Sequence, residues 1–479
     1  MPKVKKIKKV KKMKLKIKKE VKPADLPKAV ASSVSKKTPQ VLRGFKDILP
    51  SEQRYWDLIK SKAKALAKDY GFEKIELPLL EETSLFTRSV GKETDIVEKE
   101  MFSFEDRGGE RISLRPEATA QIARAYINHG MINLPQPVKL YYFGPMFRYD
   151  RPQSGRYRQF NQFGFEALGD KHPVLDAQII ILSYNFLQEL GLKVNIQINS
   201  IGCPICRKEY KVQLVNYYKT QKADLCPDCK VRLGKNPLRL LDCKEEKCQA
   251  ISEDAPQIVD WLCEECKNHF VKVLEFLDEL EIPYNLNSHL VRGLDYYTKT
   301  VFEIWPGLGQ GGPATPASQG EQGESVDEGE PKKAQNALGG GGRYDNLIEL
   351  LNGRPTPAVG ASMGIERIIL KMKEANLEPP AEEKIDIFVA QLGESAKRKA
   401  LSLYEILRKE GVKIAENFSK DGLKNQLEGA NKLGVRYTLI LGQKELSEGT
   451  ILLRDMEGGV QETLNYNKAV KEVKKRLEK

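Results

Sequence analysis

Outside one short stretch the sequence has no cysteine, because all eight cysteines lie between Cys203 and Cys266. Histidine is also scarce, with 4 in 479 residues. No apolar run approaches the roughly 18 residues that a membrane helix needs, and the lysine-rich N-terminus has no apolar signal core. We therefore expect neither a membrane span nor secretion. The length is sufficient for two or three domains, each with its own core.

Most of the chain also lacks an excess of either charge. The formal net charge is +12, but residues 1–40 contain 15 Lys against only Glu20 and Asp25, so this tail carries +13 and the remainder carries −1. We expect a disordered basic tail over residues 1–40. Three interpretations are open: a solvated charge run, a segment attracted to phosphate backbones in a salt-dependent way, or an amphipathic segment at an anionic membrane surface.

The cysteines form four close pairs within residues 200–270. The pairs are Cys203/Cys206, Cys226/Cys229, Cys243/Cys248 and Cys263/Cys266. Such spacing is typical of four-thiolate zinc sites, and without a secretory signal a disulfide framework is disfavoured. We predict an inserted module with two structural Zn²⁺ ions, each closed by four thiolates and therefore not catalytic. The sequence leaves open which pairs combine, and free buried thiols are the alternative.

Composition and pattern divide the rest of the chain. An α/β body is predicted over residues 41–380, and a low-complexity insertion interrupts it over residues 306–338. A charged linker precedes a second α/β unit over residues 384–479, where alternating strands and helices predict a parallel or mixed sheet. Its strands are expected near Ile385–Gln391, Val412–Glu416, Tyr437–Leu441 and Thr450–Leu453. Within the body we expect a helix from Thr119 to about Asn128, with Thr119 as its cap and Glu117 near the positive end of its dipole. We expect the glycine run Gly339–Gly342 to lead into a helix over Asp345–Leu351.

The most informative segment of the body is FRYDRPQSGRYRQFNQFGFE, over Phe147–Glu166. Side chains alternate between the two faces of a strand. The residues that share one face are Arg158, Phe160, Gln162, Gly164 and Glu166. An amide and a carboxylate flank a glycine that leaves room for a ligand, and an arginine-rich loop adjoins them. This pattern predicts a cationic small molecule bound beside a polyphosphate.

Two other motifs match patterns of known functional sites, but the sequence around them does not support those functions. Gly307–Gly312 matches the dinucleotide fingerprint, but Pro-Ala-Thr-Pro follows where a helix is required. Gly360–Gly364 matches the nucleophile elbow of serine hydrolases, but no histidine follows Ser362, as that topology demands. The small residues on this strand instead favour a floor against which a flat ring can lie.

Several motifs together resemble those of class II aminoacyl-tRNA synthetases, specifically the histidyl-tRNA synthetase family. Phe147–Glu166 resembles the second motif of the class, and GASMGIER at Gly360–Arg367 resembles the third. GFEKIELPLLEE, which contains Pro78, resembles the first motif, and LRPEAT, RGLDYY and GGGGRYDNL resemble histidine-specific signatures. The resemblance implies an α+β catalytic core with an antiparallel sheet flanked by helices, a C-terminal α/β anticodon-binding domain, and a homodimer in the cytoplasm.

The same resemblance implies a role for each matching position. The histidine-binding residues would be Glu117, Thr119, Arg148, Gln162, Glu166, Arg292, Tyr296 and Tyr297. The ATP-binding residues would be Arg148, Asp150 and Arg367. The catalytic residues would be Arg148, Arg292 and Arg367. Their substrates would be L-histidine, ATP with Mg²⁺, and tRNA(His), and the product would be histidyl-tRNA, formed through histidyl-adenylate.

Two proteins of other classes are rivals to this interpretation. A regulatory paralogue would bind histidine without catalysis, but such proteins typically lack the anticodon-like domain and the phosphate-binding arginines, which this chain retains. A zinc-dependent nucleic-acid-binding protein would explain the tail and the cysteines. It would not explain a long α/β body with carboxylates on its strands.

Overall fold

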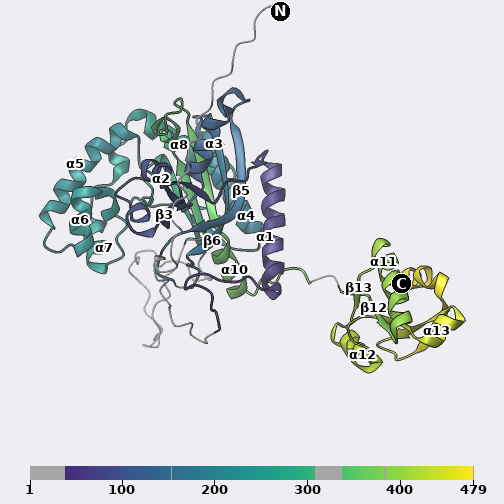
Figure 1. Ribbon diagram of the computed structural model, residues 1–479. Coiled ribbons are helices and arrows are strands. Elements are labelled where there is room, and N and C mark those ends of the chain that lie inside the picture. The colour runs from purple at the N-terminus through teal and green to yellow at the C-terminus, as the bar shows by residue number, and fades with distance from the viewer. Residues whose placement is uncertain (1–37, 153, 308–336, 382–383, 478–479) are drawn as a thin grey trace, which may run out of the picture.

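The computed structural model describes residues 38–152, 154–307, 337–381 and 384–477. It shows a large body that carries a helical extension, and a smaller C-terminal body reached through a linker (Figure 1). Nearly all of the predicted tail over residues 1–40 and of the predicted insertion over residues 306–338 lies outside the described residues.

An eight-stranded sheet organises the large body. Its strands, in spatial order, are β1 (Glu73–Lys74), β5 (Val138–Phe147), β6 (Gln159–Leu168), β11 (Ala358–Gly364), β10 (Gly339–Arg343), β9 (Thr298–Pro306), β7 (Val194–Ser200) and β8 (Tyr284–Leu286). The pairs in the middle of the sheet are antiparallel, and only the edge pairs β1/β5 and β7/β8 are parallel. The predicted antiparallel sheet is therefore confirmed.

Alternation along β6 assigns its two faces as the sequence predicts. Phe163 and Phe165 point into a core that helices cover on one side of the sheet, and the Phe163 ring lies 4.9 Å from that of Phe186. The covering helices are α1 (Pro50–Asp69), α4 (Pro173–Glu189), α8 (Glu264–Glu279) and α10 (Ile365–Glu374). Gln162, Gly164 and Glu166 consequently face the other side, where the cleft lies.

The glycine run Gly339–Gly342 leads into a helix as predicted, but the strand that the run itself forms was not predicted. It forms strand β10 in the middle of the sheet, hydrogen-bonded to β9 and to β11. The helix that follows, α9 (Leu347–Leu350), is short. Glycine has little intrinsic preference for strands, so this strand depends on its two neighbours rather than on its own sequence.

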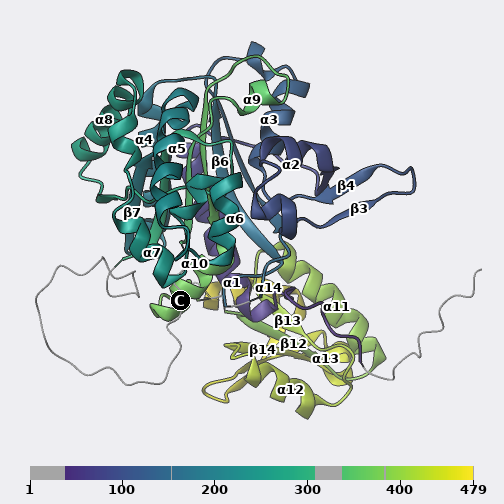
Figure 2. The ribbon, with the colours of Figure 1, turned by 90° about the vertical axis from the view of Figure 1, so that its left-hand side faces the viewer.

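The cleft side of the sheet is bordered by α3 (Thr119–Asn128) and by the cysteine module. A small sheet with the order β2-β4-β3 adjoins it, formed by β2 (Leu80–Glu82), β3 (Ser103–Glu105) and β4 (Arg111–Leu114). The module consists of α5 (Pro204–Thr220), α6 (Pro227–Lys235), the 3₁₀ turn η4 (Pro237–Leu240) and α7 (Glu246–Glu253), and it leads into α8. Figure 2 shows these helices beside the large sheet.

The C-terminal body contains a mixed sheet with the order β13-β12-β14-β15-β16. Four of its strands match predicted ones: β12 (Ile387–Gln391), β13 (Ile414–Glu416), β14 (Tyr437–Leu441) and β15 (Thr450–Asp455). The edge strand β16 (Gln461–Asn465) was not predicted, because its side chains are alternately exposed and half-buried and none belongs to the buried core. Helices α11 (Glu394–Lys409) and α14 (Ala469–Leu477) pack on one face and α12 (Leu423–Lys432) on the other.

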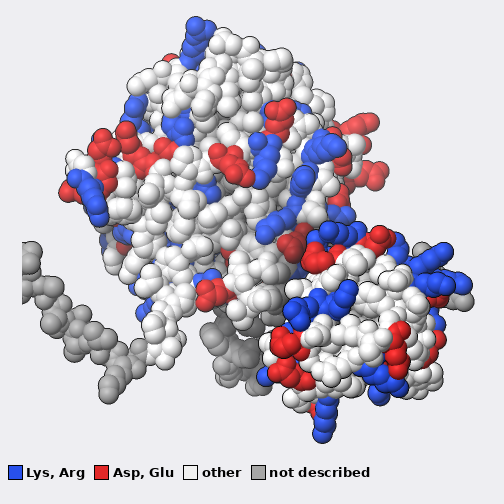
Figure 3. Space-filling model, turned by 45° about the vertical axis from the view of Figure 1, so that its right-hand side comes forward, with Lys and Arg blue, Asp and Glu red and all other residues white. Residues whose placement is uncertain are grey.

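The surface carries both signs of charge. Lys and Arg side chains are interspersed with Asp and Glu over the C-terminal body on the face that Figure 3 shows. This distribution matches the near-zero net charge of the chain beyond residue 40. None of the helices in the described ranges is both long and apolar enough to cross a membrane.

Candidate active site

A cleft of about 360 Å³ lies on the open side of the large sheet. It brings together nine of the ten predicted substrate-binding residues. Those that line it are Glu117, Thr119, Arg148, Asp150, Gln162, Arg292, Tyr296, Tyr297 and Arg367. The tenth, Glu166, lies directly beneath the lining, where its carboxylate accepts a hydrogen bond of 2.7 Å from the Thr119 hydroxyl. Residues separated by up to 250 positions in the sequence thus share one cavity.

Glycines make the cleft floor possible. A Cβ atom on Gly360 would lie 1.5 Å from Oε2 of Glu166, and one on Gly164 would lie 2.3 Å from the Tyr142 ring. A Cβ on Gly340 would lie 2.8 Å from Nη1 of Arg292. These side chains therefore rest directly on strand backbone, as the predicted small-residue floor requires.

The first end of the cleft is acidic and phenolic, and Glu166 is its deepest group. The Tyr344 hydroxyl donates to its Oε2 at 2.5 Å, which completes the pair of hydroxyl donors. Burial raises the pKa of Glu166 to about 8, although Tyr344 and Thr119 oppose that rise. The carboxyl is therefore largely protonated near neutral pH, and a cationic ligand would favour its charged form.

Glu117 is the second carboxylate at this end, and it also starts a helix. Its oxygens accept from the backbone N–H groups of Thr119 at 2.6 Å and of Ala120 at 3.1 Å. The conventional interpretation of this segment, with Thr119 as the helix cap, is wrong, because Glu117 caps α3 and Thr119 donates to Glu166 instead. Burial raises the pKa of Glu117, and the backbone donors oppose that shift.

Arg292 lies between the two ends. Its Nη1 donates to Glu303 at 2.5 Å, and its guanidinium lies 5.6 Å from the centre of the Tyr297 ring. Burial lowers the pKa of Arg292, but Tyr297 and Glu303 more than reverse this effect, so the group remains charged. Within the described part of the chain, Nε of Arg292 and Oε1 of Gln162 are buried without a hydrogen-bond partner, as groups that bind a polar ligand would be.

The second end is rich in arginine. Arg148 donates from Nε to the Pro116 carbonyl at 2.8 Å and lies over the Phe160 ring at 5.4 Å. Arg367 donates from Nη1 to the Ala337 carbonyl at 2.7 Å. Burial and the nearby guanidinium groups of Arg156 and Arg148 lower the pKa of Arg367 to about 10. A bound anion would relieve this repulsion.

Asp150 is the one acidic residue predicted for the arginine-rich end. Its carboxylate lies 3.5 Å from Arg156, so it partly balances the cations. Glu366 borders the same end, where its carboxylate accepts from the Asn161 backbone and side chain, both at 2.9 Å.

Several cleft residues were not predicted from the sequence. Glu303 on β9 pairs with Arg292, and Arg239 and Asp242 reach the cleft from the cysteine module. Glu303 carried a usable signal, since it is the one charged residue between Val301 and Trp305 in a buried strand. No sequence signal placed the module beside the cleft.

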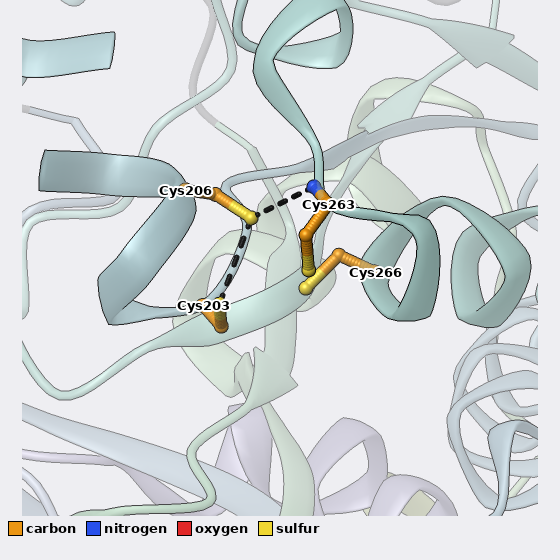
Figure 4. Close-up of side chains that lie close together, drawn as sticks. All are labelled: Cys203, Cys206, Cys263 and Cys266. Atoms are coloured by element: carbon orange, nitrogen blue, oxygen red, sulfur yellow. Dashed lines mark hydrogen bonds between the residues drawn. The ribbon is translucent and has the colours of Figure 1, made fainter. Parts of the chain in front are cut away.

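The eight cysteines form two compact groups, and this resolves the pairing. Cys203, Cys206, Cys263 and Cys266 form the inner cluster, and Cys226, Cys229, Cys243 and Cys248 form the outer cluster. Figure 4 shows the inner cluster, where α5 and α8 begin. The pairs are nested, because the first pair combines with the last.

Both clusters have dimensions that suit a tetrahedral metal ion. In each, the sulfur atoms all lie within 4.8 Å of one another. The Sγ atoms of Cys203 and Cys206 are 3.6 Å apart, and those of Cys226 and Cys243 are 3.9 Å apart. Zinc–thiolate bonds of about 2.3 Å in a tetrahedron place sulfurs about 3.8 Å apart. These residues could therefore hold two metal ions.

Known proteins resemble the chain over most of its length. The family model described as "Histidyl-tRNA synthetase" matches residues 44–203, and "Anticodon binding domain" matches residues 386–476. A protein named "Histidine--tRNA ligase" from Dehalococcoides mccartyi is 45% identical over 91% of this chain and 99% of its own length. Another with the same name, from Natranaerobius thermophilus, is 46% identical over 88% of this chain and 94% of its own.

A solved structure resembles the chain as well. The crystal structure of apo histidyl-tRNA synthetase from S. aureus superimposes with a TM-score of 0.72 at 36% sequence identity. The match covers 91% of this chain and 100% of that protein.

Proposed function

Since this chain belongs to the histidyl-tRNA synthetase family, we propose that it is an ATP-dependent histidine–tRNA ligase. It activates L-histidine with ATP and transfers the histidyl group to the 3′ end of tRNA(His). The observation that carries this proposal is the single cleft in which acidic and phenolic groups at one end meet an arginine cluster at the other. The retained arginines and the C-terminal α/β body favour the enzyme over a regulatory histidine-binding paralogue.

The acidic and phenolic end would bind histidine. Its carboxylates and hydroxyls suit a substrate that carries an α-ammonium group and an imidazole. The binding groups would be Glu117, Thr119, Arg148, Gln162, Glu166, Arg292, Tyr296 and Tyr297. The buried and unpartnered Oε1 of Gln162 supports this assignment, because a ligand N–H would satisfy it.

The arginine end would bind ATP through Arg148 and Arg367, with Asp150 beside them. Mg²⁺ prefers oxygen ligands and usually binds through substrate phosphates and one or two carboxylates, and here Asp150 and Glu366 would supply the carboxylates. When bound, the ion would neutralise part of the charge on the phosphates.

In the first step, a histidine carboxylate oxygen attacks the α-phosphorus of ATP, and the bond to pyrophosphate breaks. Arg292 would lie beside this phosphate and stabilise the charge that develops, while Arg148 and Arg367 hold the nucleotide in line. In the second step, a terminal ribose hydroxyl of the tRNA attacks the histidyl carbonyl and AMP leaves. The C-terminal body would bind the anticodon.

Histidine-dependent exchange of pyrophosphate into ATP tests the assignment directly. We expect exchange that requires L-histidine and Mg·ATP and that other amino acids do not support. Folded protein that binds histidine but shows no exchange would indicate the regulatory paralogue instead.

We also propose that each cysteine cluster holds one structural Zn²⁺. The sulfur separations support this, and four thiolates leave no open coordination position for catalysis. Elemental analysis of the purified protein should find close to two zinc ions per chain. A stably folded protein without metal would overturn the proposal.

Quaternary structure, location and domain limits complete the proposal. Leu79, Leu80 and Phe104 are 42 to 48% exposed on or beside the small sheet near Pro78, and this apolar surface supports a homodimer formed around the first class motif. Sedimentation analysis would test it. The eight thiols favour the reducing cytoplasm. We retain the proposed division into a tail (1–40), core (41–380), module (200–270), insertion (306–338) and anticodon domain (384–479).

A further inference from the structure

The inner cysteine cluster lies directly against the loop that supplies Tyr296 and Tyr297 to the cleft. Arg207 follows Cys206 in α5, and its Nη1 donates a hydrogen bond of 3.0 Å to the backbone carbonyl of Tyr297. The helix turn that contains Cys206 is thus joined to the loop that carries Tyr296 and Tyr297, the tyrosine loop, by a hydrogen bond from a charged side chain.

A second set of contacts joins the end of this loop to the cluster through Lys299, the second residue of β9. The backbone N–H of Lys299 donates to the Gly202 carbonyl at 2.9 Å, and the Ile201 N–H donates to the Lys299 carbonyl at 2.8 Å. Lys299 also donates from Nζ to Glu265 at 2.9 Å, and Glu265 lies between the last two cluster cysteines. Residues next to both cysteine pairs therefore contact one short segment, from the end of the tyrosine loop to the start of β9.

Where the loop joins β9, the backbone has a conformation that depends on surrounding contacts. Lys299 has a φ of 50°, which is unfavourable for a residue with a side chain, and it is buried. Surrounding contacts must hold such a conformation, and those of Lys299 with Ile201, Gly202 and Glu265 come from residues that flank the inner-cluster cysteines. The outer cluster reaches the loop less directly, through a hydrogen bond of 3.0 Å from Asn236 to Asp295.

We propose that Arg207 is a positioning residue that couples metal binding at the inner cluster to the shape of the histidine pocket. With the metal bound, Cys203 and Cys206 fix the first turn of α5, Arg207 holds the Tyr297 carbonyl, and the Tyr297 ring remains stacked beside Arg292. Without the metal this turn loosens, and the pocket loses its ordered tyrosines. This inference rests on the proposed histidine and metal sites.

The test uses the full-length protein with Arg207→Gln, and Lys208→Gln is the matched control. Lys208 is the next residue, is exposed, and loses the same charge. We expect Arg207→Gln to keep both metal ions but to bind L-histidine about tenfold more weakly by calorimetry, since it loses a charged hydrogen bond. The KM for ATP should change much less. Arg207→Lys should recover part of the affinity, and Lys208→Gln should match wild type.

Hydrogen exchange supplies a readout that does not depend on activity. In wild type, chelation of the metal should increase exchange over residues 292–299, and Arg207→Gln should show that increase before chelation. L-histidine should in turn tighten metal binding at equilibrium, because coupling between two ligands is reciprocal. D-histidine chelates metal equally well, so it controls for direct competition.

The outcomes separate this inference from the proposed function. If wild type catalyses histidine-dependent exchange but Arg207→Gln keeps normal histidine affinity and normal protection of residues 292–299, the coupling is wrong and the ligase assignment stands. If wild type shows no histidine-dependent exchange, the assignment itself fails.

Discussion

The two ends of the cleft differ in how their charged groups are balanced before a substrate binds. At the acidic end, Glu166 and Glu117 have hydroxyl and backbone donors, and burial keeps protons on them at higher pH than usual. At the basic end, guanidinium groups crowd together, and this crowding helps to lower the pKa of Arg367. The comparison indicates that the carboxyl groups of the proposed histidine end are held in place in advance, whereas repulsion at the proposed ATP end is only partly balanced by Asp150 and would be relieved by a bound anion.

The largest effect is expected from Arg292→Ala, because Arg292 belongs to both ends. Its loss would remove the fixed charge that we propose lies beside the reacting phosphate, and it would leave Glu303 without its partner. We expect the rate of histidine-dependent exchange to fall roughly 10²- to 10³-fold, with a smaller change in histidine affinity. Arg111→Ala, at an exposed position on β4, serves as the control. Near-normal turnover would remove Arg292 from this role.

Arg367→Ala should change the binding of ATP without changing the binding of histidine, which would separate the proposed roles of the two ends. We expect the KM for ATP to rise on the order of tenfold or more, because a charged hydrogen-bond donor to phosphate is lost. The affinity for histidine alone should be unchanged, and the dependence of ATP binding on salt should become shallower. An equal loss of histidine affinity would show that the two ends are not independent.

Glu166→Gln tests the acidic end, with an expected loss of histidine affinity of about tenfold. It also predicts a change with pH. The folded protein retains the Glu166 proton up to about pH 8, whereas the unfolded chain releases it near 4.5, so this group lowers the free energy of unfolding as pH rises across that interval. Denaturation by urea at pH 6 and pH 8 should show a smaller decrease for Glu166→Gln than for wild type.

The smallest effect on either end should follow removal of residues 1–40, because every residue that lines the cleft lies later in the chain. Exchange of pyrophosphate should be nearly unchanged. RNA affinity should fall and its salt dependence should become shallower, since 15 Lys are lost. Loss of adenylate formation would contradict this separation of roles.

Local pattern was enough to predict much of this protein. The alternation on β6 correctly placed Gln162, Gly164 and Glu166 on one face, and cysteine spacing correctly indicated two four-thiolate groups. Features set by contacts between distant segments could not be predicted. The glycine strand β10 depends on hydrogen bonds to β9 and β11, and the nesting of the cysteine pairs depends on α5 and α8 beginning close together.

The details of the site also divide into features that local sequence predicts and features that depend on contacts between distant segments. The kinds of side chain at the two ends were predictable, because the carboxylates and hydroxyls of one end and the guanidinium groups of the other lie in contiguous sequence motifs. The pairing of Arg292 with Glu303 was not, because it depends on the register between β9 and the loop before it. The cap of α3 was misassigned for a local reason, since a glutamate can accept from the first helical N–H groups as well as a threonine can.

The glycine floor limits how this enzyme could be engineered or could evolve toward a different amino acid. Replacing Gly340 or Gly360 by a larger residue would displace Arg292 or Glu166 before the new side chain touched any substrate. The depth of the pocket is therefore set by the main chain and cannot be changed by substitutions at these positions. Changes of substrate preference must therefore begin at the walls, above all at Gln162 and the tyrosine loop. A library randomised at these wall positions, with the floor left intact, is the design that the architecture favours.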